Sequence, residues 1–89
     1  MIEQATLNLC REIGQREQSA TVWLLLGMAC GMVERALPGV QPSRVLLEDM
    51  AILGRNGSQV AVGQTVIESW IDVEDHKRRT RLRQFPTAP

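Results

Sequence analysis

The sequence predicts an all-α fold, a small four-helix array made of two αα-hairpins. Apolar residues recur at three- and four-residue spacing in four stretches, and glycine, proline and serine separate these stretches. The 89 residues suffice for one small domain, and with only three aromatic residues its core must be aliphatic. We expect helices at about 2–18, 19–37, 43–54 and 58–75 in a helical domain 1–75, followed by a basic extension at 76–89.

The first predicted helix, 2–18, is amphipathic. Ile2, Leu9 and Ile13 share one face, and charged residues occupy the opposite one. Gly14 weakens its last turn by up to about 1 kcal/mol relative to alanine. Ser19 then provides a good N-cap for the second helix.

The second predicted helix, 19–37, is apolar on nearly every side. Its apolar run, 20–33, is fourteen residues long, which is short of the ~20 that span a bilayer, so we expect a buried helix and no membrane insertion. A helix that is apolar all round must be covered all round. Either the other three helices cover it, or an apolar groove remains for a ligand helix.

The third and fourth predicted helices form the second hairpin. The segment 38–42, with two prolines, ends the second helix, and Ser43 caps the third. Gly54 and Gly57 can adopt positive φ in the turn, and Ser58 is placed to cap the fourth helix. An alternative treats residues 59–67 as an alternating strand of an α+β module, but Trp70 and Asp72 continue the helical pattern.

Charge is divided unevenly along a chain whose net charge is zero. Residues 1–75 hold ten acids and five arginines, a net of −5, whereas residues 76–89 hold one lysine and four arginines, a net of +5. The basic run could simply complement the negative end of a helix dipole and the acids one turn earlier. It could instead bind an acidic protein or a phosphate backbone.

No catalytic, cofactor or metal site is predicted, and we expect no enzyme. Cys10 and Cys30 lack CxxC spacing and lie far from the only histidine, His76, so we expect two buried free thiols. Glu48 and Asp49 are adjacent on a helix and point about 100° apart, a poor arrangement for acid–base catalysis. The GRNG turn lacks the Lys-Ser/Thr of a phosphate-binding loop.

The second hairpin resembles a known family. Leu47, Met50, Ala51, Gly54, Gly63 and Ile67 fit a degenerate tetratricopeptide pattern. More narrowly, LLEDMAILGRNGSQVAVGQTVIESWI resembles the first hairpin of the tetratricopeptide-like cochaperones of type III secretion needle subunits. The resemblance is carried by Leu46, Leu47, Ala51, Leu53, Gly54, Glu68, Trp70 and Ile71, within 26 of the 89 residues. It needs about one extra residue near 55–58, and the hairpin lies later in this chain than in the longer family members.

The resemblance implies a bacterial cytoplasmic protein in a hetero-oligomer. Its apolar face would hold the amphipathic C-terminal helix of a small secretion subunit, and a second small helical cochaperone would pack alongside. Residues 1–18 are polar and acidic, so we expect no signal peptide. The residues expected to contact the partner, each of which could equally be internal core, are Trp23, Leu24, Met28, Leu47, Met50, Ile67 and Trp70.

The rival interpretation is a helix-turn-helix DNA-binding regulator whose basic C-terminal tail grips phosphates. The second hairpin, two amphipathic helices joined by a tight turn, has the apolar spacing that a helix-turn-helix motif needs. However, the recognition helix would be 58–75, which contains no arginine or lysine and ends in acids. Such a helix would be repelled by the major groove, so the sequence argues against nucleic acid as the partner.

Overall fold

The protein is all-helical over residues 2–84, the part that the computed structural model describes. The four helices are α1 (Gln4–Glu17), α2 (Ala20–Ala36), α3 (Arg44–Arg55) and α4 (Val60–Gln84). This confirms the predicted all-α array, with bounds close to those expected for the first three helices. Residues 60–67 are helical, so the alternative strand is wrong.

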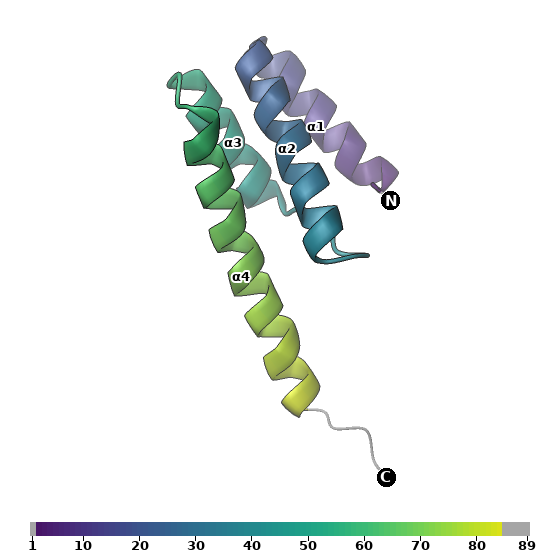
Figure 1. Ribbon diagram of the computed structural model, residues 1–89. Coiled ribbons are helices and arrows are strands. Elements are labelled where there is room, and N and C mark those ends of the chain that lie inside the picture. The colour runs from purple at the N-terminus through teal and green to yellow at the C-terminus, as the bar shows by residue number, and fades with distance from the viewer. Residues whose placement is uncertain (1, 85–89) are drawn as a thin grey trace.

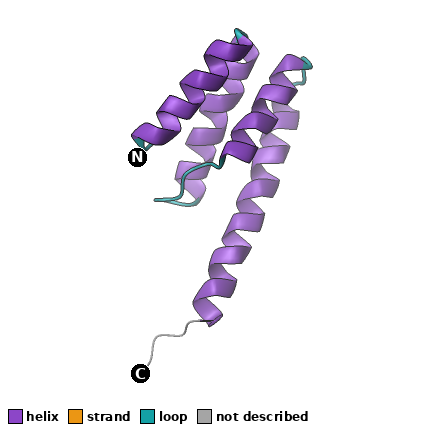
Figure 2. Ribbon diagram, turned by 180° about the vertical axis from the view of Figure 1, so that it is seen from behind, coloured by secondary structure: helices purple, strands orange, loops and turns teal. Residues whose placement is uncertain are grey.

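The helices form an open array in which α2 and α3 are central. Each of these two contacts the other three helices, whereas α1 and α4 do not touch. A closed four-helix bundle would bring its first and last helices together. Figures 1 and 2 show two layers instead, with α2 and α4 in front in one view and α1 and α3 in front in the other. Within residues 2–84, α4 contacts only α2 and α3, so one of its sides has no neighbouring helix.

The core lies where the inner faces of all four helices meet, and it is aliphatic as expected. The chain covers only part of the second helix: Val22, Leu25, Leu26, Ala29, Cys30 and Val33 are buried, whereas Trp23 and Leu24 are exposed. The largest fully buried side chains are Ile13, Val22, Leu25, Leu26, Val33, Leu46, Leu47, Met50 and Ile67. Two glycines permit close helix contacts: a Cβ on Gly54 would lie 3.0 Å from the backbone of Val22, and one on Gly63 would lie 2.6 Å from Leu25 Cδ2.

The helix ends follow the expected chemistry with one correction. Ser19 Oγ accepts a hydrogen bond from the Val22 N–H at 3.4 Å, and Ser43 Oγ accepts one from the Leu46 N–H at 3.2 Å. Gly57, with φ of 70°, terminates α3. The expected cap at Ser58 is wrong: its N–H donates to the Leu53 carbonyl at 2.9 Å to complete that terminus, and α4 starts at Val60.

The fourth helix is longer than predicted. It continues nine residues beyond the expected end at residue 75 and includes the basic segment as far as Gln84. No proline or glycine interrupts this segment, so the hydrogen-bond ladder continues. Its 25 residues span about 37 Å, and the carboxyl half projects beyond the other helices (Figure 1). The rest of the predicted extension, 85–89, lies outside the described residues.

None of the helices within residues 2–84 combines the length and apolar character needed to cross a membrane.

Candidate partner-binding surfaces

The seven residues expected to bind a partner lie in different environments. Leu47, Met50 and Ile67 are fully buried in the chain's own core, so no partner reaches them in this conformation. Met28 and Trp70 are partly buried at its margin. Trp23 and Leu24 are 42% and 56% exposed. The four accessible residues do not form one surface.

Trp23 belongs to the contact between α1 and α2. Its indole ring lies against Gly14, where a methyl group would overlap the ring atoms. A small hollow of about 190 Å³ beside it is lined by Cys10, Cys30 and apolar side chains. The two sulfur atoms are 3.7 Å apart, and both thiols are free and buried, as predicted. Burial, with Cys10 beside it, raises the pKa of Cys30 to about 12, so this thiol is a poor nucleophile.

An apolar face runs along α3 and α4. On α4 its stripe has helical spacing and consists of Val62, Val66, Trp70 and Val73. On α3, Val45 and Ile52 flank Asp49 at positions i−4 and i+3, so all three lie on one side of that helix. A hollow of about 470 Å³ between the helices is lined by Leu46, Asp49, Thr65, Val66, Ser69, Trp70 and Val73. We call this surface the α3/α4 face.

The α3/α4 face gathers half of the large exposed hydrophobic residues in the described part of the chain. Four of the eight, Val45, Ile52, Val62 and Val73, lie here and are 44–69% exposed. Asp49 is the only charged residue that lines its hollow. From Val62 to Val73 the stripe extends about 16 Å, enough for three turns of a ligand helix. Such a contiguous apolar patch marks an interaction surface more than scattered exposed residues do.

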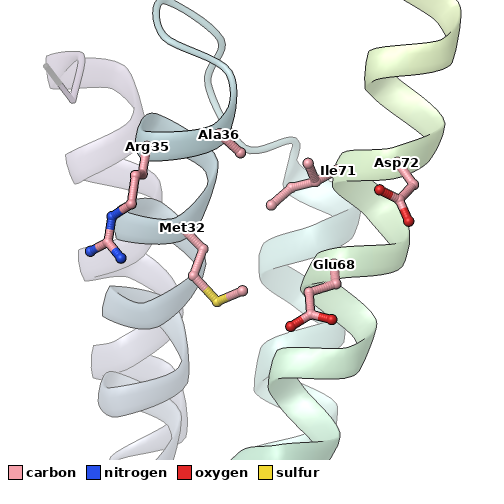
Figure 3. Close-up of a pocket in the computed structure, with 6 residues that line it drawn as sticks. All are labelled: Met32, Arg35, Ala36, Glu68, Ile71 and Asp72. Carbon is pink, nitrogen blue, oxygen red and sulfur yellow. The ribbon is translucent and has the colours of Figure 1, made fainter.

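A second hollow of about 400 Å³ lies between α2 and α4 (Figure 3). Met32 and Ala36 of α2 and Ile71 of α4 provide its apolar part. Glu68 and Asp72 form an acidic rim on the α4 side, and Arg35 points away from α4. Leu24 and Met28 precede Met32 on the same side of α2, at four-residue steps. We call this surface the α2/α4 hollow.

The layer of α1 and α3, in contrast, is bridged by ion pairs. Arg16 Nη2 donates to Glu48 Oε1 at 2.6 Å, and Arg55 Nη2 donates to Glu17 Oε2 at 2.6 Å. These contacts raise the pKa of both arginines, and the hydrogen bond from Arg55 lowers the pKa of Glu17 to about 2. These ion pairs tie α1 to α3.

Residues 2–84 contain no group of three or more histidine, cysteine or acidic residues able to hold a metal ion. Glu48 pairs with Arg16 on the α1 side, while Asp49 lines the α3/α4 face, so the two adjacent acids diverge. His76 lies on the projecting end of α4 beside Lys77, Thr80 and Arg81.

Sequence reasoning missed Val45, Val62, Val66 and Val73 as surface residues. The spacing from Val62 to Val73 was visible, but it is the same spacing that a core stripe has. No protein-family model matches this chain, and comparison with curated proteins and with solved structures found no match.

Proposed function

We propose that this protein is a non-enzymatic helix-binding cochaperone whose α3/α4 face holds an amphipathic helix of a partner protein. The observation that carries the proposal is the continuous apolar stripe from Val62 to Val73, which has one acid beside it. Amphipathic helices dock into such faces through side chains spaced three and four residues apart. Trp70, at the margin of the core, offers the large, partly buried ring that often anchors such contacts.

The resemblance at residues 46–71 supports a more specific form of the proposal. In that form the partner is the C-terminal helix of a type III secretion needle subunit or a similar export subunit. The protein works in the bacterial cytoplasm, in a hetero-oligomer with a second small helical cochaperone. Covering the apolar face of the subunit helix would prevent premature polymerisation.

A pair of matched substitutions tests the site. Val73→Asp on the α3/α4 face and Leu24→Asp beside the α2/α4 hollow each place a carboxylate on an exposed apolar residue. Coexpression with the needle subunit and its second cochaperone, followed by size-exclusion chromatography, measures complex formation. We expect Val73→Asp to abolish the complex while circular dichroism stays helical, and Leu24→Asp to retain it.

If Leu24→Asp alone abolished the complex, the partner helix would bind at the α2/α4 hollow, which would contradict its assignment to the α3/α4 face. Retention by both variants, or no complex with the unmodified chain, would contradict helix binding as proposed.

The helix-turn-helix alternative rests on the basic end of α4. Residues 60–76 of this helix contain no arginine or lysine, and the basic residues start at Lys77, where the helix projects from the array. Neutralising Arg78, Arg79, Arg81 and Arg83 tests this alternative by fluorescence anisotropy with duplex DNA at two salt concentrations. Salt-sensitive DNA binding that the neutralised variant loses would favour it, and no binding by the unmodified chain would exclude it.

A further inference from the structure

The projecting half of α4 lacks the support that the other helices have. This half extends beyond the ends of the other three helices (Figure 1), and most of residues 74–81 are charged. Helices of this kind, polar on all sides and without tertiary contacts, are marginal in water. Leu82 is 73% exposed, the highest value among the large hydrophobic residues of the described chain. A contact with a second protein surface would both support this helix and cover Leu82.

The charges of α4 are arranged in two blocks. Glu68, Asp72, Glu74 and Asp75 form an acidic block, and Lys77, Arg78, Arg79 and Arg81 form a basic block directly after it. Lys77 and Arg79 pair with acids of their own helix, whereas Arg78 and Arg81 have no ion-pair partner within residues 2–84. If two such helices lie antiparallel, each acidic block faces the other basic block. A two-fold axis therefore satisfies both charge contacts at once.

We propose that the chain forms a homodimer through antiparallel pairing of the projecting halves of α4. The contact stripe consists of Ile71, Asp75, Arg78 and Leu82, whose spacing of four, three and four residues places them on one side of the helix. In one antiparallel register, Ile71 meets Leu82 of the second copy and Asp75 meets Arg78 of the second copy. The stripe is thus complementary to itself in both charge and apolar character.

The α2/α4 hollow supplies the site for the exposed leucine. Ile71 lies in the contact stripe and also lines this hollow with Met32 and Ala36. Leu82 of the second copy, opposite Ile71, would enter the apolar part of the hollow. The acidic rim of Glu68 and Asp72 would then lie along the basic block of the second copy, while Arg35 points away from α4. Two exposed apolar features, one leucine and one hollow, are covered by the same contact.

The homodimer goes beyond the proposed function and uses a different surface. Val73 lies on the opposite side of α4 from Ile71 and Leu82. Val73→Asp should therefore leave the dimer intact, and Leu82→Asp should leave binding of the partner helix intact. Each proposal can fail while the other stands.

Size-exclusion chromatography with light scattering on the full chain tests the dimer. We expect a concentration-dependent mass that approaches twice the 9.9 kDa of one chain and falls as salt is raised. Asp75→Arg or Arg78→Asp alone places like charges together at both symmetry-related charge pairs of the contact, so each should weaken dimerisation at least about tenfold. Mixing these two variants, or combining both changes in one chain, restores opposite charges and should restore the dimer.

Arg11→Asp provides the matched control, because it makes the same charge reversal at an exposed position on α1, which does not contact α4. It should leave the dimer unchanged, and circular dichroism should show the same helix content in every variant. A monomer at the highest soluble concentration would overturn the proposal. So would a dimer that the single charge reversals leave intact, or one that mixing the two variants fails to restore.

Discussion

The indole ring of Trp23 in α2 lies against the backbone of Gly14 in α1, in a contact that only glycine permits. A residue expected to bind a partner thus has part of its ring engaged within the chain, although its side chain is 42% exposed. The same contact explains why α1 carries a glycine in its last turn, despite the cost in helix propensity.

Gly14→Ala should destabilise the protein by about 1–3 kcal/mol, because the added methyl group overlaps the ring and forces it to move. Gly31→Ala is the matched control within α2, since a Cβ there meets nothing within 4 Å. It should stabilise by about 0.5–1 kcal/mol through helix propensity. Urea unfolding measures both changes, and a stabilising effect of Gly14→Ala would show that the ring is free to leave.

Met50→Glu should unfold the protein, because Met50 is fully buried in an aliphatic core where a carboxylate would lose its hydration. Circular dichroism would show the loss of helix. Met50→Leu preserves volume and apolar character, so its cost should stay below about 1.5 kcal/mol. A helical, stable Met50→Glu variant would contradict the core assignment and make this residue available to a partner.

The ion pair between Glu17 and Arg55 should make the stability of the folded protein depend on pH in the acid range. The pKa of Glu17 is lowered from 4.5 to about 2 in the folded state, chiefly by the hydrogen bond from Arg55. A carboxyl group with a depressed pKa contributes stability above its unfolded pKa, and this contribution is lost as pH falls from 4.5 towards 2.

Glu17→Gln should therefore flatten the fall in thermal stability between these pH values. Arg55→Gln should flatten it in part, because Arg16 Nε still donates to Glu17 Oε2 at 3.1 Å. Differential scanning fluorimetry across this range provides the measurement. An acid transition that is identical in the unmodified chain and in both variants would show that other carboxyl groups are responsible.

Cys30 should resist alkylation in the folded protein. Its pKa is raised to about 12 by burial and by Cys10, and it is 5% exposed, so little thiolate is present or accessible. In a Cys10→Ala variant, iodoacetamide at about pH 8 should label Cys30 only as fast as the chain unfolds, and urea should accelerate the labelling. Rapid labelling without urea would contradict the buried placement.

Local features of the fold were predictable because their causes are local. Ser19 and Ser43 accept hydrogen bonds from residues three positions later, and Gly57 adopts the positive φ that ends α3, so a few neighbouring residues decide these ends. Ser58 shows the limit of such reasoning. A serine after a glycine could serve either helix, and the chain uses its backbone N–H to finish α3.

The candidate surfaces were less predictable, since core and surface residues come from the same apolar set. Val66 and Ile67 are neighbours with similar side chains, yet Ile67 is buried against α2 and α3 while Val66 lines the α3/α4 face. Met50 and Met28 differ in the same way: Met50 is fully buried, whereas Met28 is partly buried at the margin of the core. Periodicity reports which side of a helix is apolar, but not how much of that side another helix covers.

The sequence by itself determined four helices, their capped starts at Ser19 and Ser43, an aliphatic core and a division of charge at residue 76. These follow from spacing and composition, which act within a few residues. Only the tertiary structure decided that α1 and α4 stay apart, that Trp23 rests on Gly14, and that Leu24 and Trp70 lie on different surfaces. Such relations depend on how four helix faces share one small core, because each helix can bury only what its neighbours cover.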